Sequence, residues 1–594
     1  MAVTAFNSCG KSSRNTLVDA DSSIELKGSL RPLQNNLNLL PLPFYDAAVN
    51  LHPSFPIVFL SQPSSKAIRA AGIIASYFGM LPNDFRAVRF PTSYGTIPSG
   101  NAIVIAESTS DLPATLNVTS SSGPVIAMRT NPVDPYSKVL VISGDNADDL
   151  VTAAQALVLQ RDMLQGDTIR IPQGSFALPR KREPDDAPRW LSTEHQTVLG
   201  DFAQTVDLQG DGGTPIGAYF RLPPDLYTSQ RPNLAFHMNY RYNGIPLANE
   251  SSLQSYLNGA YVSSMPLPHT EKASASVSAV VPIPNVNLRP FSNSLMFKFI
   301  FQIAKKGKCQ DTAPLNLQGA VLKDSYLDIQ DLPHWVQLPD LERFANAGYP
   351  FTREADLSDT AVVLPDQPTP EEIEIFLTFM GHFGAQTGFP VIRVDVTTSE
   401  GMKHDGTKDY LVLGTVEDQP TLTTLDPELP VRIDGGGLHI QDTQGFFAAL
   451  QHAWWKVRSS DHVLSGQLET SGGLPDVLIE GIEWPRRSSR SVVLIAIRDK
   501  SVVPNFLSVF LKNSQSGDIS QSVSVLHGNH FVSYRIGDDA YWVGSLSLWI
   551  RINMLFSEFP WLVVVSTLVF CLLMAALIRA MLRRRARIRL QGID

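Results

Sequence analysis

The sequence predicts a mixed multidomain fold. A jelly-roll-like β-sandwich and two flavodoxin-like α/β domains in tandem repeat precede an amphipathic helix and one C-terminal transmembrane helix. Three observations predict this fold. A strand–turn–helix pattern occurs twice at a constant offset, a region of alternating strands separates the two copies, and an uncharged apolar run near the C-terminus leads into a cluster of arginines.

The repeated pattern covers residues 56–79 and 361–384. Each copy is a short apolar strand, a turn and a helix, and more strands and a helical stretch follow. Strands that alternate with helices favour a parallel sheet with helices on both faces. In the second copy, Thr369, Pro370 and Glu372 predict a capping-box start for the helix. The matched pairs are Gln62 and Gln367, Pro63 and Pro368, Ile68 and Ile373, Phe78 and Phe383, and Gly79 and Gly384.

Between the two copies lie alternating apolar and polar runs, which include residues 217–222, 233–242 and 294–303. Polar and Pro-rich turns separate them, and no helical period appears, so we expect a β-sandwich. The motif DSYLDI at 324–329 is matched by DSSIEL at 21–26, which predicts that an earlier β-sandwich precedes the first α/β domain. The predicted segments are a remnant of the first β-sandwich with its linker (1–49), the first α/β domain (50–182), the second β-sandwich (190–350), the second α/β domain (352–535), an interfacial helix (545–558), a transmembrane helix (559–578) and a basic tail (579–594).

The apolar run at 559–578 contains no charge and is long enough to cross a hydrocarbon core of roughly 30 Å. A buried core helix is the alternative, but a core helix rarely runs straight into six arginines. Such a cluster resists translocation, so the tail is expected in the cytoplasm and the bulk of the chain outside. A tail-anchored protein with a cytoplasmic bulk would have to translocate this tail. The topogenic residues are Arg579, Arg583, Arg584, Arg585, Arg587 and Arg589.

The preceding segment, residues 545–558, has a polar side and an apolar side. Ser547, Arg551 and Glu558 recur at helical spacing, and apolar residues fill the rest. This distribution is typical of a helix that lies in the membrane interface with its apolar face down. The alternative is a simple N-terminal extension of the spanning helix.

Composition and motifs exclude several function classes. The formal charge is −9, and it is −14 without the six tail arginines and Asp594, which argues against nucleic acid as a partner. The three cysteines show no metal-type spacing. The turns at 61–65 and 365–368 lack the glycines of a phosphate loop, and Walker A, GxSxG and HExxH motifs are absent. We therefore expect no catalytic, cofactor-binding or metal-binding residue, and Gly435–Gly437 is interpreted as a turn.

These features together resemble one family, the periplasmic regulatory component of bacterial cellulose synthase, historically called the cyclic di-GMP-binding protein. The matching segments are LPLPFYD at 40–46, DSYLDI at 324–329 and SLSLWIRINMLFSEFPW at 545–561. The resemblance covers essentially the whole chain. It departs at the N-terminus, which has no apolar h-region of a signal peptide and lacks most of the first carbohydrate-binding-type domain. The sequence is interpreted as a processed or N-terminally truncated form, or as one whose start is misassigned.

The resemblance implies a non-catalytic subunit in the inner membrane, with a single pass, its bulk in the periplasm and its C-terminus in the cytoplasm. Its partners would be the catalytic subunit, the nascent β-glucan and the membrane, and cyclic di-GMP would act on the complex through the catalytic subunit. The alternative is a membrane-anchored carbohydrate-binding protein that is not tied to a synthase. A glycan-modifying enzyme is disfavoured because no paired-carboxylate or nucleophile motif is found.

Specific residues follow from these roles. Aromatic faces beside planar polar groups suit a glycan, although Tyr240 and Tyr242 share a strand face and are alternatively core residues. Small or polarisable residues on the spanning helix suit close contact with a partner helix. The glycan-contact candidates are Asn239, Tyr240, Arg241, Tyr242 and Trp335, and the docking candidates are Trp549, Trp561, Ser566, Ala575 and Ala576.

Overall fold

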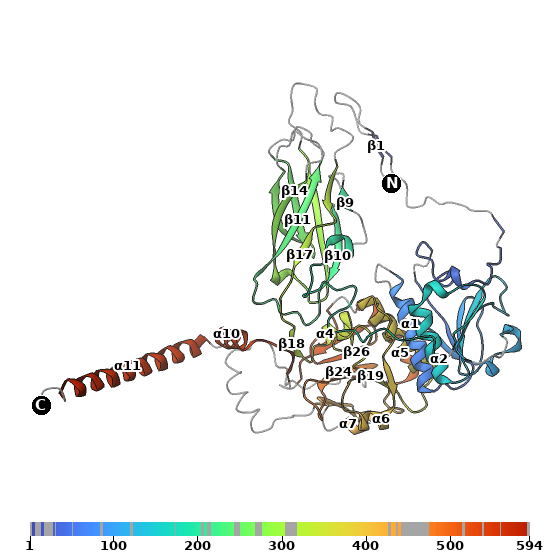
Figure 1. The fold of residues 1–594 in the computed structure, drawn as a ribbon. Coiled ribbons are helices and arrows are strands. Elements are labelled where there is room, and N and C mark those ends of the chain that lie inside the picture. Colours follow the sequence, from blue (N-terminus) through green and yellow to red (C-terminus); the bar gives the residue numbers. More distant parts are fainter. Residues whose placement is uncertain are drawn as a thin grey trace.

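The structure is a computed structural model of the 594-residue chain. It describes residues 3–5, 14–16, 28–29, 31–49, 52–82, 87–118, 123–172, 174–202, 207–210, 215–242, 250–267, 276–302, 318–425, 429–434, 437–440, 475–513, 517–536, 540–558 and 560–590. Figure 1 shows a β-sandwich that stands on a pair of α/β domains, and a long C-terminal helix that extends away from all three.

The first α/β domain is a six-stranded sheet in the order β4-β3-β5-β7-β6-β8. Helices α1 and α2 pack on the face that carries Ile57 and Ile103. The opposite face, with Val58 and Val104, is covered by turns around Leu116. The elements are β3 (Ile57–Phe59), α1 (Ser65–Met80), β4 (Thr92–Tyr94), β5 (Ala102–Ala106), β6 (Val125–Thr130), β7 (Lys138–Ser143), α2 (Ala147–Leu159) and β8 (Thr168–Arg170).

The second α/β domain is a seven-stranded sheet in the order β20-β19-β21-β25-β24-β26-β27. Helices α5 and α9 cover the face that carries Leu411, and the short helices α6 and α7 place Met402 and Leu425 against the other face. The elements are α4 (Leu341–Ala347), β19 (Thr360–Val363), α5 (Pro370–Thr387), β20 (Asp395–Thr397), α6 (Ser399–His404), β21 (Asp409–Thr415), α7 (Pro420–Leu425), β22 (Val431–Asp434), β23 (Gly437–Ile440), β24 (Val477–Glu483), β25 (Ser491–Ile497), α9 (Val503–Asn513), β26 (Val523–His527) and β27 (His530–Tyr534).

The two sheets share one topology, since the first six positions of the second sheet match the six of the first, strand for strand. The expectation of parallel sheets is nevertheless wrong for part of each domain. β6 pairs with β7, and β24 with β25, in antiparallel fashion. In both cases the connection (residues 131–137 and 484–490) is too short for a parallel crossover, which needs a dozen or more residues. The sheets are therefore mixed, and a flavodoxin-like assignment is not confirmed.

The two α/β domains are joined through α1 and α5, which lie side by side in one continuous hydrophobic core. Glycines allow this close approach. A Cβ added to Gly79 would collide with the main chain of Gly381, and a Cβ added to Gly384 would collide with the main chain of Ser76. The capping box predicted for α5 is confirmed, because Thr369 and Glu372 bond reciprocally.

A single arginine connects the C-terminal ends of both helices. The Arg189 guanidinium donates to the carbonyl oxygen of Met80 in α1 (2.8 Å) and to that of Ala385 in α5. A cation at the ends of two helices meets the partial negative charge of both. Arg189 comes from the segment that leads into the sandwich, so this contact also fixes the sandwich on the helix pair.

The β-sandwich consists of two antiparallel sheets that enclose one apolar core. One sheet has the order β10-β15-β12-β13, and the other has the order β14-β11-β16-β9 with β17 paired to β11. Burial alternates along β11, as expected for strands with one face in the core. The strands are β9 (Asp207–Gly210), β10 (Ile216–Arg221), β11 (Asn233–Tyr242), β12 (Ser252–Leu257), β13 (Ala260–Pro266), β14 (Val277–Pro284), β15 (Ser292–Ile300), β16 (Gly319–Leu322) and β17 (Tyr326–Asp328).

The remaining elements lie at the two ends of the chain. Near the N-terminus, β1 (Val3–Ala5) and β2 (Arg14–Thr16) form an antiparallel pair. Near the C-terminus, β28 (Tyr541–Gly544) pairs with β18 (Trp335–Leu338), and two helices follow, α10 (Leu548–Glu558) and α11 (Pro560–Leu590). Figure 1 shows α10 leaving beside β18 at the base of the sandwich.

Candidate functional site at the β18–β28 joint

The β18–β28 pair forms a joint from which the chain leaves for its C-terminal helices. The pairing is antiparallel, and the Ser545 N–H donates to the carbonyl oxygen of His334 (3.0 Å). Gly544 has φ of +100°, and a Cβ there would collide with the same His334 carbonyl group. Only glycine adopts such a backbone without strain. The Tyr541 hydroxyl donates to Ser491 Oγ (2.6 Å), which ties β28 to β25 of the second α/β domain.

Two tryptophans stack on one face of this joint. The rings of Trp335 and Trp542 lie 3.8 Å apart at an angle of 6°. Trp335 pairs with Gly544 and Trp542 with Gln337, so the two indoles are diagonal neighbours on the same face. Because Gly544 has no side chain, nothing opposite Trp335 blocks the overlap. The Tyr227 ring meets Trp335 edge to face at 5.7 Å.

The stacked rings border a cavity of about 460 Å³ whose other walls are mostly polar. Trp542 remains 40% exposed, which leaves an aromatic surface open to a ligand. Aromatic faces with convergent amide, hydroxyl and charged groups are the usual chemistry of an orienting ligand pocket. The lining residues are Leu226, Tyr227, Thr228, Ser229, Trp335, Val336, Gln337, Pro339, Asp340, Glu342, Arg343, Ser520, Gln521, Arg535 and Trp542.

The pocket contains two carboxyl groups, Asp340 and Glu342. Burial, and then the charge of Asp340, raise the pKa of Glu342. Both carboxylate oxygens of Asp340 already accept hydrogen bonds within the protein. Oδ1 accepts from the Glu342 N–H at the start of α4 (3.0 Å), and Oδ2 accepts from Arg343 Nε (2.8 Å). A hydrolytic pair needs one carboxylate free to act on a water or on the sugar. The arrangement suits binding better than hydrolysis.

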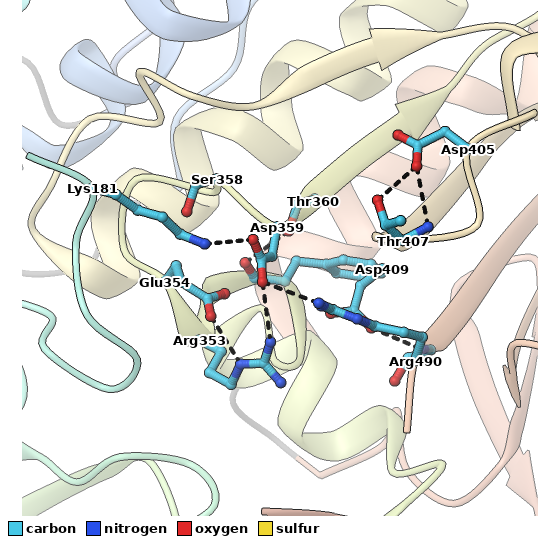
Figure 2. Close-up of polar contacts among 12 residues, drawn as sticks. Lys181, Arg353, Glu354, Ser358, Asp359, Thr360, Asp405, Thr407, Asp409 and Arg490 are labelled. Atoms are coloured by element: carbon cyan, nitrogen blue, oxygen red, sulfur yellow. Dashed lines mark hydrogen bonds and ion pairs between the residues drawn. The ribbon is translucent and has the colours of Figure 1, made fainter. Parts of the chain in front are cut away.

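A charged network holds the linker on the second α/β domain, as Figure 2 shows. Lys181 Nζ lies 2.6 Å from Asp359 Oδ1, and Arg490 reaches both Asp359 (3.1 Å) and Asp409 (3.0 Å). Burial raises the pKa of Asp409. At Asp359 burial acts in the same direction, but hydrogen bonds from Lys181 and Arg490 outweigh it and lower the pKa. The network fixes the segment between the first α/β domain and the sandwich on the second α/β domain.

A second polar cluster surrounds His334, the residue that precedes Trp335 in the chain. His334 Nδ1 is 2.8 Å from Asp225 Oδ1 and 3.2 Å from Asp185 Oδ2, and its Nε2 is 3.0 Å from Thr193 Oγ1. Burial would lower the pKa of His334, but the Asp225 hydrogen bond and the two carboxylate charges raise it to about 9. Burial, and then Asp225, raise the pKa of Asp185 well above its ordinary value.

The glycan-contact candidates of the sandwich divide into two groups. Tyr240 and Tyr242 are 2% and 4% exposed and stack on each other inside the core, so they are core residues and are not accessible to a glycan. Asn239 and Arg241 lie on the outer face, where Asn239 Nδ2 donates to Asp324 Oδ2 (2.9 Å). Trp335 lies at the joint, where it stacks on Trp542. Trp542 was not among the residues predicted from the sequence. The signal for Trp542 is the adjacent aromatic pair Tyr541-Trp542 just before the amphipathic segment.

The membrane-anchor candidates lie on α10 and α11. Trp549 and Trp561 are 71% and 45% exposed. One helix, Trp561–Arg587, is long and apolar enough to cross a membrane, and none of its apolar window is buried by the rest of the protein. Ser566 Oγ donates to the Val563 carbonyl (3.0 Å). The other positions, namely Ala575, Ala576, Arg579, Arg583, Arg584, Arg585, Arg587 and Arg589, all lie within α11.

Some sequence-based predictions fall outside the described residues. These are the DSSIEL motif at 21–26, the interpretation of most of Gly435–Gly437 as a turn, and the interpretation of the Trp454-Trp455 pair as packing or interface residues. Cys9 and Cys309, for which the sequence assigns no disulfide, also lie outside them. Cys571 is described and lies exposed on α11.

Comparisons with known proteins follow the same domain order. Family models match the first FD domain of cellulose synthase BcsB at 36–171, the second CBM domain of cellulose synthase BcsB at 196–326, and the second FD domain of cellulose synthase BcsB at 334–495. A protein named cyclic di-GMP-binding protein from Xanthomonas axonopodis pv. citri is 33% identical over 96% of this chain and 75% of its own length. One with the same name from Pseudomonas fluorescens is 31% identical over 96% of this chain and 78% of its own length.

A third relative has a different name and a greater length. The protein named cellulose synthase 1 from Komagataeibacter xylinus is 28% identical over 99% of this chain, which spans 39% of that protein. A segment that resembles nearly the whole of this chain is therefore part of a longer polypeptide that carries the synthase name.

Proposed function

This chain belongs to the cellulose synthase BcsB family, and from that membership we propose that it is the non-catalytic, membrane-anchored subunit of a cellulose synthase complex. It supports the catalytic subunit in cyclic di-GMP-activated cellulose synthesis. The observation that carries the proposal is the relation to cellulose synthase 1, because nearly the whole chain aligns within a polypeptide of that name. When one protein contains two parts in a single polypeptide, the same two parts often occur in other organisms as separate chains that bind each other. We therefore expect this chain to bind a separate synthase chain.

The anchor explains how the subunits meet. The apolar surface of α11 is left uncovered by the rest of the chain, so lipid or a partner helix must cover it. The arginines that follow the apolar part favour a cytoplasmic C-terminus and a periplasmic bulk. In that orientation the interfacial helix α10 lies at the outer surface of the inner membrane. Ser566, Ala575 and Ala576 are the positions where a partner helix approaches most closely.

The joint pocket supplies a contact for the emerging glucan. Only three residues separate β28, which carries Trp542, from α10, so the stacked tryptophans lie close to the membrane surface. A glucan that leaves the membrane-embedded catalytic subunit would meet these rings before it reaches the sandwich. Sugar rings pack on aromatic faces, and the amide and guanidinium groups of Gln337 and Arg535 can receive the hydroxyls.

Cyclic di-GMP acts on the complex through the catalytic subunit in this proposal. The relatives carry the name of the dinucleotide, but this sequence has no arginine motif paired with a second nucleotide-binding motif. Its tail arginines are explained by membrane topology, because they favour a cytoplasmic C-terminus. Purified chain alone should therefore bind no labelled cyclic di-GMP, whereas the complex with the catalytic subunit should bind it.

The experiment that separates this function from its alternative is co-purification. The tagged full chain, extracted in mild detergent, should retain a multi-span glycosyltransferase. A variant in which Ser566, Ala575 and Ala576 are all changed to Leu remains apolar enough to span a membrane but blocks close contact, and it should lose that partner. Recovery of the full chain without any such enzyme, together with binding to cellulose, would favour a carbohydrate-binding protein not tied to a synthase.

A further inference from the structure

Three ligand-type side chains converge at the joint from distant parts of the sequence. Asp185 comes from the linker before the sandwich, Asp225 from the connection between β10 and β11, and His334 from the residue before β18. Their nearest ligand atoms all lie within 4.8 Å of one another. The side chains of Asp185 and Asp225 are only 9% and 2% exposed.

Two buried polar atoms, one of them in this cluster, lack a hydrogen-bond partner in the described part of the chain. Among the described residues, neither Asp185 Oδ1 nor the Tyr349 hydroxyl has a hydrogen-bond partner, and both atoms are buried. Burial raises the pKa of Tyr349, and the charges of Asp225 and Asp185 raise it further. A buried polar group without a partner costs about 1–3 kcal/mol. The unpartnered Asp185 oxygen, in a cluster of two carboxylates and one imidazole, indicates a missing cationic ligand.

We propose that Asp185, Asp225 and His334 bind one Zn²⁺ ion. One imidazole nitrogen and two carboxylate oxygens are common ligands of this ion, and an open fourth position takes a water. The His334 nitrogen lies 2.8 Å and 3.2 Å from the two carboxylate oxygens. Ligand atoms of a tetrahedral zinc site are about 3.4 Å apart. Shifts of a few tenths of an ångström would bring the nitrogen to this distance from both oxygens, and the two carboxylate oxygens already lie within 4.8 Å of each other.

The surroundings of the histidine fit metal ligation. His334 Nε2 lies 3.0 Å from Thr193 Oγ1, and a metal-bound histidine ordinarily bonds through its second ring nitrogen in this way. A water at the fourth position could bond to Asp185 Oδ1, which has no other partner among the described residues. An imidazole ligand favours zinc over magnesium or calcium, which take oxygen ligands almost exclusively.

The ion would hold together three segments that meet where the chain turns toward the membrane. Because the ligands are far apart in the sequence, no local spacing motif marks them, and the absence of metal-type spacing among the cysteines is unrelated to this site. The competing arrangement holds no ion: a protonated His334 bridges the two carboxylates, and Asp185 shares or keeps a proton. The two arrangements can be distinguished because the first binds Zn²⁺ from solution, whereas the second holds protons and binds no metal ion.

The test uses the full chain in detergent, stripped with EDTA, returned to chelator-free buffer and titrated with ZnCl₂ by calorimetry. Thermal unfolding is followed in parallel with EDTA, ZnCl₂ or MgCl₂. The wild type should bind one equivalent of zinc and unfold at a higher temperature with zinc than with EDTA or magnesium. Asp185→Asn mimics a neutral carboxyl group, so its unfolding in EDTA should match the wild type. Its zinc affinity should fall at least about tenfold, since even outer partners of a metal ligand change affinity by that much.

His404→Gln is the matched control, because His404 is an exposed histidine on α6 that pairs with Glu400 outside the cluster. It should titrate as the wild type does. Absence of zinc uptake by the wild type would leave a protonated histidine bridge only and overturn the proposal. Equal zinc binding by the wild type and Asp185→Asn would place the ion elsewhere and overturn it as well. Neither result bears on the role in cellulose synthesis.

Discussion

Gly384 lies against the main chain of Ser76, so closely that a Cβ on the glycine has no room. The same contact occurs a second time, between Gly79 and Gly381. Gly79 matches Gly384 in the repeat, and Ser76 matches Gly381, so each helix presents the same pair of positions to the other. This is the geometry of an isologous interface around a two-fold axis. The repeat thus resembles a dimer whose two halves are joined in one chain.

Gly384→Ala should destabilise the chain although alanine is the better helix former. The intrinsic gain is about 1 kcal/mol, whereas the added Cβ meets main-chain atoms of α1, which cannot move aside as a side chain can. Overpacking of this kind costs about 1–3 kcal/mol, and contact with main-chain atoms puts the cost at the upper end of this range, so we expect a net loss of about 1–2 kcal/mol in denaturant unfolding. Gly28→Ala is the control, since nothing lies within 4 Å of a Cβ there. An increase in stability for Gly384→Ala would contradict the glycine-mediated contact.

Gly544→Ala should loosen the joint between β18 and β28. The residue has φ of +100°, and the new Cβ would collide with the His334 carbonyl group. Gly528→Ala separates the two effects, because Gly528 also has positive φ (59°) but open space around it. Limited proteolysis should release the helical C-terminal segment from Gly544→Ala faster than from Gly528→Ala. Equal rates would mean that backbone strain alone matters and that the close packing at Gly544 does not.

Trp542→Ala should weaken binding of a soluble cello-oligosaccharide to the joint pocket. Losing one aromatic stacking contact of about 1 kcal/mol corresponds to roughly a fivefold rise in Kd. Trp542→Phe keeps an aromatic face and should recover most of the affinity. Tyr219→Ala is the control, because Tyr219 is an exposed aromatic residue on the sandwich strand β10. Calorimetric titration of the three variants checks the prediction, and a loss with Tyr219→Ala instead would move the contact to the sandwich.

Stability should fall in acid because of His382 in α5. Burial lowers the pKa of His382 to about 4, while its Nε2 donates to the Ala345 carbonyl (2.8 Å). The folded-state pKa lies below that of the unfolded chain, so protonation favours unfolding. The contribution of about 3 kcal/mol is fully present above pH 6.5 and is lost as the pH falls toward 4. His382→Gln should show a flatter decline of the unfolding midpoint between these pH values, and parallel profiles would refute the assignment.

Much of the fold could be predicted because its signals are local or periodic. The offset between Gln62 and Gln367 indicates two copies of one α/β unit, and the two sheets share their strand order. Thr369 and Glu372 predict the start of α5 because a capping box needs only four consecutive residues. The antiparallel pairs β6–β7 and β24–β25 differ from the parallel expectation because their connections, residues 131–137 and 484–490, fit a hairpin and are too short for a crossover helix.

The candidate site was harder to predict because its parts are distant in sequence. Trp335 and Trp542 are separated by about two hundred residues in the sequence, and the pairing of β18 with β28 brings them together. Asp185, Asp225 and His334 likewise come from three segments that only the folded joint brings together. Tyr240 and Tyr242 are close in sequence, but the alternation of residues along one strand does not show which face of the strand is buried. Burial of both rings between the sheets decides that question.

The most direct test of the central claim measures glucan synthesis in membrane vesicles. Vesicles that contain the catalytic subunit and either the full chain or a variant without residues 546–594 are supplied with labelled UDP-glucose and cyclic di-GMP. The variant keeps the whole described globular part and loses only the membrane helices. We predict insoluble β-glucan with the full chain and none with the variant. Equal synthesis with both, or with the catalytic subunit alone, would contradict a membrane-anchored subunit that the synthase requires.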